Sequence, residues 1–350
     1  MGKPGILIYG ANGYTGALVA RRAKASGLAP VLAGRSAQVE ALGRELGFES
    51  RVFPLDDPAA LDRGLSGMAL VLHCAGPFSR TSKPMADACL RTGTHYADIT
   101  GEASVFEALQ ARDAEARSRG VMLLPGAGMD VVPSDCLAAH LKRRLPTATR
   151  LALAFSSSAG VSRGTATTMV ENLPKGGLVR RMGRLERVPL AWKTRSIDFG
   201  RGPRHCVTIA WGDVSTAFHS TGIPEIEVYA PVRRSRALAL RLLRPFLGLL
   251  GAPPVQAFLK RRIRARAEGP SDAARSRGFA LFWGEAEDGA GRRASARQRT
   301  PEGYTLTAIT AVGVAERVLS GQAPAGFQTP SRAYGADFIL EHAGCSREDL

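Results

Sequence analysis

A glycine-rich segment directly after a short apolar run constrains the fold of this chain more than any other feature. The run Gly5–Tyr9 has the length and apolar character of a buried parallel strand, and Gly10-Ala-Asn-Gly-Tyr-Thr-Gly16 follows it directly. Thr15–Ser26 is rich in Ala, Leu and Arg and predicts a helix that ends at Gly27. Strand, glycine turn and helix in this order predict the first βα unit of a dinucleotide-binding domain, because glycine allows a tight turn and close approach of a phosphate.

The alternation of strands and helices continues through the first third of the chain. We predict a helix over 37–46 and one long helix over Val105–Arg119. Five more runs predict strands: Pro30–Ala33, Arg51–Pro54, Leu70–Cys74, His95–Ile99 and Val121–Leu124. Such an alternation gives a parallel sheet with helices on both faces. The fold class is therefore α/β, and we predict that residues 1–132 form a Rossmann domain with a doubly wound parallel sheet.

The pattern changes after Pro133. Ser134–Arg144 predicts a helix, and irregular Gly- and Arg-rich stretches separate the strand candidates that follow. These candidates are Arg150–Ser156, Cys206–Trp211, Glu225–Ala230, Phe279–Glu287 and Gly303–Thr310. We expect a second α+β domain over residues 133–306, serving substrate binding or dimerisation, so a homodimer is one expectation. A last helix is predicted over Thr307–Ser320.

Positive charge is concentrated in the second part of the chain. Up to Val132 the chain has 14 basic and 13 acidic residues, and from Pro133 onward it has 33 and 18. Val228–Ala267 alone holds ten basic residues and no acid. This balance favours an anionic partner, such as an acyl carrier, coenzyme A phosphates or an anionic membrane surface. The alternative is a solvated, arginine-rich surface. We predict no nucleic-acid partner, since no nucleic-acid-binding motif accompanies the charge.

The same basic segment carries apolar residues at near-helical spacing: Leu238, Leu242, Leu243, Phe246, Leu249 and Leu250. They predict either an interfacial helix or an ordinary amphipathic helix that covers the core of the second domain. We predict no membrane-spanning helix, because arginines and prolines interrupt Ala237–Leu259, and no signal peptide, because the run Gly5–Tyr9 is too short. The five cysteines form no C-x-x-C pair and predict neither a disulfide framework nor a metal site. We expect a cytoplasmic protein, with peripheral membrane attachment as the alternative.

The residues after the second predicted strand indicate which dinucleotide binds. An NAD-binding domain usually has Asp or Glu here to bind the ribose hydroxyls, whereas this chain has Ala33-Gly-Arg-Ser36. Arg35 can pair with a 2′-phosphate and Ser36 can donate to it, which predicts NADP. The alternative is that Arg35 is an ordinary surface charge. Asp56 either contacts the adenine or caps the helix that begins near Pro58.

The turn after the fourth predicted strand, Cys74-Ala-Gly-Pro-Phe78, lies at the carboxyl end of the sheet. Ligands bind at that end of parallel strands, so we expect the backbone of this turn to line the nicotinamide ribose. The predicted cofactor-binding residues are Gly10, Asn12, Gly13, Tyr14, Thr15, Gly16, Gly34, Arg35, Ser36, Asp56, Cys74, Ala75, Gly76, Pro77 and Gly128.

Two polar clusters follow the fifth and sixth predicted strands, where we expect substrate to bind. The first cluster contains Tyr96, Asp98, Thr100 and Glu102, and the second runs from Gly126 to Asp135. Tyr96 and Asp130 are the candidate catalytic residues, because each can transfer a proton to a reduced product. The alternative for the acids is a structural role as helix caps. His73 is predicted to be a core histidine with its hydrogen bonds satisfied.

At these positions the chain resembles the saccharopine dehydrogenase-like oxidoreductase family. The matching motifs are Gly10–Gly16, Ala33–Arg35, Cys74–Phe78, Tyr96–Asp98 with Gly101-Glu102, Pro125–Asp135, Thr300–Tyr304 and Ala333–Phe338. The resemblance implies NADP, a Rossmann domain, a second α/β domain and a C-terminal segment, residues 307–350, that returns to the first domain. The family includes saccharopine reductases, trans-acting enoyl reductases and lipid-droplet-associated relatives, and this chain looks closer to the enoyl reductase and lipid-associated branch.

The resemblance leads to three expectations for function. The first is NADPH-dependent reduction of an activated C=C bond in a lipid-like or polyketide acyl substrate, with the enolate stabilised by Tyr96 or by N–H groups near Gly128–Asp130. The second is reduction of an imine derived from an amino acid. That reaction needs arginines for the substrate carboxylates, with Arg163, Arg180, Arg181 and Arg204 as candidates. The third is a non-catalytic NADP-binding protein associated with lipid.

Overall fold

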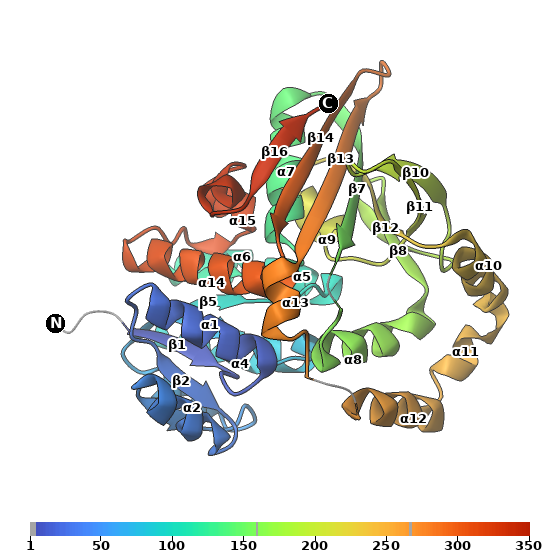
Figure 1. The fold of residues 1–350 in the computed structure, drawn as a ribbon. Helices are drawn as coiled ribbons and strands as arrows, with labels where there is room; N and C mark the ends of the chain where they lie inside the picture. Colours follow the sequence, from blue (N-terminus) through green and yellow to red (C-terminus); the bar gives the residue numbers. More distant parts are fainter. Residues whose placement is uncertain (1–4, 159, 266–267) are drawn as a thin grey trace. The chain divides into compact units, whose positions relative to one another are not determined.

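The computed structural model describes residues 5–158, 160–265 and 268–350, and the chain divides into two compact units. Met1–Val132 and Tyr304–Gly335 form the first unit, and Pro133–Gly303 and Ala336–Leu350 form the second. Both units are built from sheets and helices (Figure 1).

The first unit is built on a seven-stranded parallel sheet in the order β15-β6-β5-β4-β1-β2-β3. The strands are β1 Gly5–Tyr9, β2 Val31–Gly34, β3 Ser50–Val52, β4 Met68–His73, β5 His95–Asp98, β6 Met122–Leu124 and β15 Gly326–Phe327. The α/β class and the doubly wound sheet are confirmed, and β15 adds a seventh strand that the sequence did not reveal. Strand order reverses between β1 and β4, which makes this pair the switch point where such sheets bind ligands.

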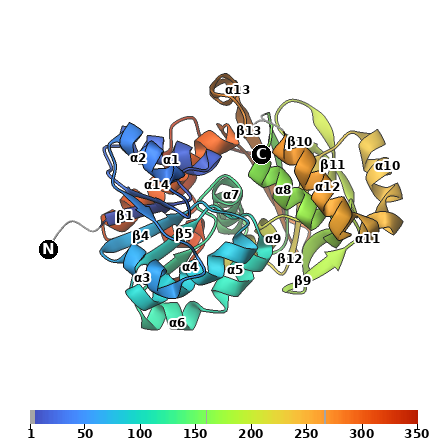
Figure 2. The same ribbon diagram turned by 90° about the horizontal axis from the view of Figure 1, so that it is seen from below.

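Helices cover both faces of this sheet. Figure 2 shows α1 (Tyr14–Ala25), α2 (Gln38–Leu46) and α14 (Gly303–Leu319) along one face. The other face carries α3 Pro58–Leu65, α4 Phe78–Thr92, α5 Ala103–Gln110 and α6 Asp113–Ser118. The core between the layers is formed by fully buried strand residues such as Leu7, Val71 and Leu123.

The long helix predicted over Val105–Arg119 is wrong, because the chain forms α5 and α6 instead. The break lies at Arg112, whose backbone leaves the helical conformation with φ −101° and ψ 11°. Its guanidinium pairs with Asp87 of α4 and with Glu115, 2.9 Å away, which favours the bend over a continuous helix.

The predicted strand Gly303–Thr310 is also wrong: these residues begin α14. The strand is β14, Arg293–Pro301, which was not predicted. Its buried side consists of Ala294, Ala296, Gln298 and Thr300, which are small or polar, so the usual apolar alternation is absent from the sequence. α14 is buried on almost every side, and a helix of that kind shows no amphipathic period.

The second unit contains a nine-stranded mixed sheet with the main order β10-β11-β12-β7-β13-β14-β16, while β8 pairs with β12 and β9. Its strands are β7 Ala148–Ser157, β8 Gly177–Arg181, β9 Arg184–Val188, β10 Thr194–Asp198, β11 Pro203–Thr208, β12 Glu225–Pro231, β13 Phe279–Asp288, β14 and β16 Ser346–Asp349. α7 (Val132–Arg144) packs on β13, where Gly284 leaves room for Leu137 and Leu141.

The longer of the further helices in this unit are α8 Arg163–Asn172, α9 Asp213–Thr221, α10 Arg234–Leu242, α12 Pro253–Arg264 and α13 Asp272–Arg277. A short 3₁₀ helix, η2 (Arg244–Phe246), and a one-turn α-helix, α11 (Leu247–Leu250), connect α10 to α12. In the described part of the chain, no helix combines the length and apolar character needed to cross a bilayer.

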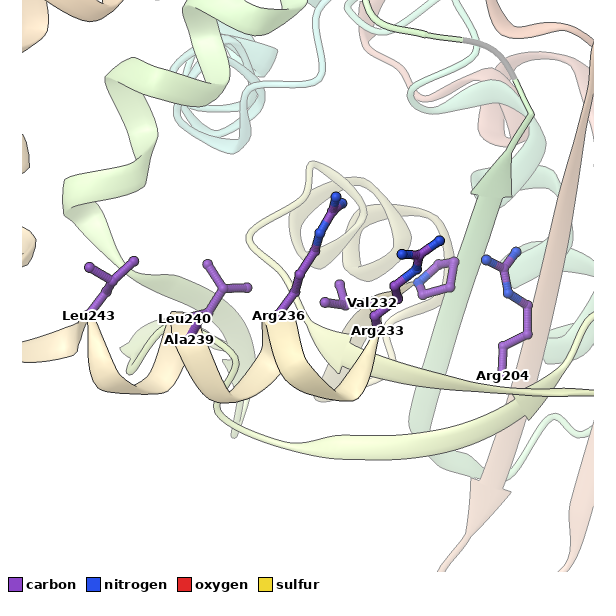
Figure 3. A pocket seen from close by; sticks show the side chains of 8 residues that line it. Arg204, Val232, Arg233, Arg236, Ala239, Leu240 and Leu243 are labelled. Atoms are coloured by element: carbon purple, nitrogen blue, oxygen red, sulfur yellow. The ribbon is translucent and has the colours of Figure 1, made fainter.

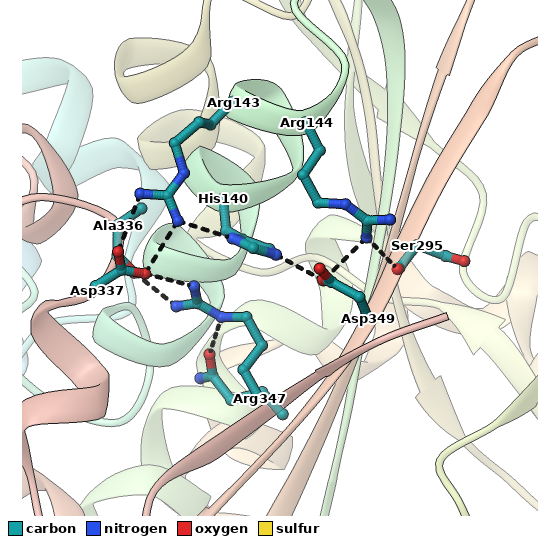
Figure 4. A network of polar contacts seen from close by, with 9 residues as sticks. His140, Arg143, Arg144, Ser295, Ala336, Asp337, Arg347 and Asp349 are labelled. Atoms are coloured by element: carbon teal, nitrogen blue, oxygen red, sulfur yellow. Dashed lines mark hydrogen bonds and ion pairs between the residues drawn. The ribbon is translucent and has the colours of Figure 1, made fainter.

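The C-terminal segment returns to the first unit only in part. The helix α15 (Pro330–Tyr334) ends the return, and residues 336–350 belong to the second unit, so the expected packing of all of 307–350 on the Rossmann domain is wrong. The reason is that β16 pairs with β14 and is fixed by ion pairs to α7 (Figure 4). Asp349 lies 2.7 Å from His140 Nε2 and 2.9 Å from Arg144. Asp337 pairs with Arg143 and Arg347.

Candidate functional site

The glycine loop after β1 and the turn after β4 are packed together at the switch point of the first sheet. Gly10 has φ +81°, and an added Cβ would lie 2.9 Å from both the Cβ and the N of Ala75. The N–H of Cys74 donates to the carbonyl of Tyr9 (2.8 Å), which joins the ends of the two strands. Only glycine meets both the backbone angle and the packing at position 10.

The other two glycines of the loop have different roles. At Gly16 a Cβ would lie 2.2 Å from the Gly10 carbonyl oxygen, so glycine is needed there for close packing of helix on strand. At Gly13, among the described residues, a Cβ would meet only that same oxygen, at 3.3 Å. The Gly13 backbone therefore has open space in front of it, as a phosphate-binding position requires.

The N-terminus of α1 fits an anionic ligand. Gly13 is its N-cap residue, no side chain caps it, and no acid lies in its first turn. The N–H groups at Tyr14 and Thr15 therefore belong to a helix end whose partial positive charge favours a phosphate. Asn12 is exposed and donates to Gln38 of α2 (3.4 Å), and its Oδ1 lies 3.0 Å from the position a Cβ on Gly34 would occupy.

The structure brings Arg35 and Asp56 to the same edge of the site. Both are exposed and both influence the pKa of Tyr9, which burial raises to about 12, with Arg35 lowering and Asp56 raising it. Arg35 has no ion-pair partner among the described residues, so its guanidinium is available to a ligand phosphate. The alternative role for Asp56 as a helix cap is wrong, since Asp57 caps α3 by accepting from Ala59 N (2.9 Å) and Ala60 N (3.0 Å).

The turn after β4 is held in place from two sides. Thr81 Oγ1 donates to the Ala75 carbonyl (2.6 Å), and Glu102 accepts from the N–H groups of Phe78 (2.9 Å) and Ser79 (3.2 Å) at the start of α4. Gly76, in the middle of the turn, is exposed. Cys74 has a pKa raised by burial to about 12, so it stays a thiol and contributes its backbone rather than a thiolate.

Tyr96 does not fit the catalytic role predicted for it. Its side chain is 0% exposed in the core of the first unit, and its hydroxyl donates to Asp98 Oδ2 at 2.5 Å. Burial raises the pKa of Tyr96 well above its usual value. A hydroxyl that is enclosed and already bonded to a neighbour cannot reach a substrate, so the structure assigns Tyr96 to the core.

Asp98 organises the ends of β5 and β6. Besides the Tyr96 hydroxyl, it accepts from the N–H groups of Thr100 and Gly126, both at 2.9 Å. Burial raises its pKa to about 6, although these hydrogen bonds act in the opposite direction. Asp98 is therefore a structural acid, but it does not cap the following helix α5, whose N-cap residue is Glu102.

We expect Asp98→Ala to destabilise the protein by about 3 kcal/mol or more, because three buried donors lose their acceptor together. Chemical denaturation followed by circular dichroism measures the change. Asp56→Ala removes an exposed carboxylate from the same unit and is the control, with an expected change below about 0.5 kcal/mol. Equal stability of both variants would show that the Asp98 hydrogen bonds contribute nothing.

The loop after β6 contains the other catalytic candidate, Asp130. Its carboxylate is half-buried against Gly101, where an added Cβ would lie 3.0 Å from Oδ2. Burial raises the pKa of Asp130 to about 6. A carboxyl group with that pKa, at the carboxyl end of β6, can hold and release a proton near neutral pH.

Several residues that build this loop come from far along the chain and were not predicted. Thr307 accepts from Met129 N (3.0 Å), and Thr310 donates to the Ala127 carbonyl (2.7 Å), both from α14. Tyr304 packs edge-on against Tyr14, with ring centroids 5.1 Å apart. Of these distant residues, Tyr304 alone lies in a motif that the sequence singles out, Thr300–Tyr304, and that motif does not by itself indicate a role.

His73, at the end of β4, is a core residue as expected, but its hydrogen bonds are not satisfied. Both ring nitrogens are buried and have no hydrogen-bond partner among the described residues. Burial lowers the pKa of His73 to about 3, so the ring stays neutral between the aromatic rings of Tyr9, Phe78 and Tyr96.

The fold and the site together define a dinucleotide-binding domain of the Rossmann class. Residues 6–124 match the family described as the saccharopine dehydrogenase NADP binding domain. This match confirms the sequence resemblance and the expectation of an NADP-binding domain.

Two relatives and one solved structure extend the comparison. The chain is 30% identical over 218 residues to a trans-acting enoyl reductase of Mycobacterium ulcerans. The aligned region covers 57% of this chain and 52% of the relative. It is 35% identical over 152 residues to a trans-acting enoyl reductase of Mycobacterium leprae, covering 40% and 36%. The chain thus spans about half, or less, of these relatives.

The fold is similar to that of a saccharopine dehydrogenase (L-Glu forming) from Saccharomyces cerevisiae. The TM-score is 0.67 at 14% identity, with 99% of this chain and 100% of the other covered. At this identity the likeness concerns the fold alone.

We expect NADPH to bind more tightly than NADH by about 1.5–3 kcal/mol, or roughly ten- to hundredfold, because only NADPH offers a phosphate to Arg35. Calorimetric titration of both cofactors measures the difference. Arg35→Ala should weaken NADPH binding toward the NADH value, while Arg22→Ala, which removes an exposed arginine of α1, should leave both affinities unchanged. Equal affinities in the unaltered protein would contradict the role of Arg35.

Proposed function

We propose that this protein is an NADPH-dependent oxidoreductase that reduces an activated C=C bond in a lipid-like or polyketide acyl substrate. The proposal that NADPH is the cofactor rests on two observations. The Gly13 backbone is open at the switch point, and the guanidinium of Arg35 after β2 has no ion-pair partner among the described residues. The match of residues 6–124 to an NADP-binding domain supports the same conclusion. The relatives that carry the name trans-acting enoyl reductase support reduction of a C=C bond.

The residues present fit a dinucleotide. Gly10, Gly13 and the start of α1 would hold the pyrophosphate, Arg35 and Ser36 the 2′-phosphate, and the backbone of Cys74–Pro77 the nicotinamide ribose. NADPH, when bound, supplies the hydride that adds to the β-carbon of the substrate. The electron pair of the C=C bond then moves toward the carbonyl oxygen, which becomes an enolate.

Residues of the loop after β6 would serve that enolate. The N–H groups of Gly126, Ala127 and Met129 already donate to Asp98 and Thr307. The N–H of Gly128 has no acceptor among the described residues, so it is the candidate donor to an enolate oxygen. Asp130, protonated below about pH 6, would deliver a proton to the α-carbon and regain one from water.

Reduction of an imine derived from an amino acid would need arginines that bind the substrate carboxylates. Most of the candidate arginines already have hydrogen-bond or ion-pair partners within the second unit. Arg180 is buried and donates to the carbonyls of Val214 (2.6 Å) and Gly183 (2.7 Å). Arg163 pairs with Glu268 at 2.7 Å, and Arg181 pairs with Glu186 at 3.2 Å. Arg204 donates to Ser156 Oγ (2.9 Å) and has no carboxylate partner within the described residues. Because Arg163 and Arg181 are paired with carboxylates and Arg180 is buried, we favour the enoyl reductase proposal.

The test follows NADPH absorbance with an α,β-unsaturated acyl thioester and, separately, with lysine plus 2-oxoglutarate as an amine and carbonyl pair. The proposal expects oxidation with the thioester. Oxidation with the amine pair alone would replace it by imine reduction. Oxidation with neither, in a protein that binds NADPH, would favour the non-catalytic alternative.

A further inference from the structure

The segment Arg233–Ala265, called here the α10–α12 segment, exposes large apolar side chains. Among the described residues, six of the twelve exposed large apolar side chains lie in it: Leu238, Leu242, Leu243, Phe246, Leu249 and Phe258. Leu242 is 66% and Leu249 64% exposed. The alternative that the apolar residues of this segment cover the core of the second domain is therefore wrong for five of the six named from the sequence, because only Leu250 is half-buried. The exposure of the other five in water needs a physical explanation.

This exposure does not arise from a loosely attached segment. Ala237 is buried against Ala191 and Val207 on the opposite side of α10. Arg244 donates to the carbonyls of Leu190 (2.8 Å) and Ala191 (2.9 Å). The segment therefore has one side anchored to the second unit and another side that presents leucine and phenylalanine outward.

The segment itself carries charge of one sign, although Glu171 of the neighbouring helix α8 pairs with Lys260 (2.5 Å). Val228–Ala267 contains ten basic residues and no acid. Some arginines elsewhere in the second unit are neutralised by close carboxylates, as in Arg195–Glu285 (2.6 Å). By contrast, the guanidinium groups of Arg204, Arg233 and Arg236 have no carboxylate partner among the described residues.

These three arginines line one hollow of about 450 Å³ together with the inner edge of α10. Figure 3 shows their side chains in a row that continues, along the helix, into Leu240 and Leu243. Positive charge thus lies at one end of the hollow and an apolar surface at the other. A phosphate can pair with adjacent guanidinium groups, and an acyl chain can lie on the leucines.

We propose that the α10–α12 segment is a docking surface for a bilayer that contains anionic phospholipid, with a lipid phosphate bound by Arg204, Arg233 and Arg236. A bilayer interface offers an anionic layer and an apolar layer within about 5–10 Å of each other, which matches a segment that has exposed leucines and, together with Arg204 of β11, arginines without a carboxylate partner among the described residues. A soluble acidic protein would neutralise the arginines but would have to cover all six apolar side chains as well. The proposal does not depend on the reaction that the protein catalyses.

Co-flotation with vesicles tests the proposal on the full chain. One set of vesicles contains phosphatidylcholine alone, and the other contains phosphatidylcholine and phosphatidylglycerol in equal parts, each at low and high salt. We expect binding to the phosphatidylglycerol vesicles that weakens in high salt, because the arginine contribution is screened. Absence of binding to these vesicles, or equal binding to both sets, would overturn the proposal.

Two pairs of substitutions separate the charge and apolar contributions. Arg233→Glu with Arg236→Glu should weaken binding roughly tenfold or more, since each basic residue near the surface contributes about 1 kcal/mol. Leu242→Asp with Leu249→Asp should weaken it by a similar factor, because two inserting side chains become charged.

Matched controls exclude effects of net charge and of stability. Arg22→Glu with Arg63→Glu makes the same charge change on exposed arginines of the first unit, and Leu340→Asp alters an exposed leucine outside the segment. The controls should bind like the unaltered protein. Equal losses in controls and test variants would refute a specific surface, and so would binding only to an isolated acyl carrier protein.

Discussion

The variant Gly13→Val is expected to fold and to lose detectable NADPH binding. Gly13 has φ −78° and ψ 161°, extended angles that valine adopts readily, and its added Cβ would meet only the Gly10 carbonyl oxygen, at 3.3 Å, among the described residues. The cost to the free energy of unfolding should stay near about 1 kcal/mol, the range of N-cap substitutions. The valine methyl groups would instead fill the open space that the pyrophosphate needs.

Thermal unfolding and calorimetric titration with NADPH measure the two effects separately. Gly289→Val is the matched control, because Gly289 is exposed and nothing among the described residues lies within 4 Å of its added Cβ. Gly16→Ala should behave differently from both and lower stability, since its Cβ would lie 2.2 Å from a carbonyl oxygen. A folded Gly13→Val protein that binds NADPH normally would show that the loop is not the phosphate site.

The second large effect is expected at Asp130. If its protonated carboxyl delivers the proton to the α-carbon, kcat/KM should fall about tenfold per pH unit above its pKa. That pKa is raised by burial to about 6, so activity is full below it and declines as the carboxyl loses its proton. Asp130→Asn should lower kcat by ~10²–10⁴-fold and remove this decline, because asparagine does not titrate.

The pH profile of kcat/KM, measured from one unit below that pKa to two units above, is the direct readout. Glu316→Gln, which removes an exposed carboxylate of α14 in the same unit, should keep both the rate and the profile. An Asp130→Asn protein with the unaltered rate and pH profile would exclude Asp130 as the proton donor.

The sequence identifies those parts of the site that depend on local backbone conformation and packing. Gly10 and Gly16 are identifiable because a turn between strand and helix has no room for a side chain. Arg35 is identifiable because its position follows the second strand directly. The parallel order of the sheet follows from the alternation of elements, apart from β15, whose two residues are too few to give a pattern.

The parts that sequence reasoning missed depend on contacts between distant residues. Thr307 and Thr310 reach the loop after β6 from about 180 positions away, and a threonine in an apolar helix gives no signal of such a role. Tyr96 was placed at the end of β5 correctly, but its orientation into the core follows from packing around Asp98. β16 was missed because its edge pairing with β14 is fixed by ion pairs rather than by apolar residues.

Transfer of deuterium from NADPH to an acyl substrate shows directly whether this protein reduces an activated C=C bond. NADPH in which both hydrogens on the nicotinamide C4 are replaced by deuterium is incubated with the protein and an α,β-unsaturated acyl thioester. The acyl product is then analysed by mass spectrometry and NMR. The account predicts one deuterium per product molecule, bound to the β-carbon, with a solvent proton on the α-carbon. A protein that binds NADPH tightly yet transfers no deuterium to the β-carbon would contradict the assignment as a reductase of activated C=C bonds.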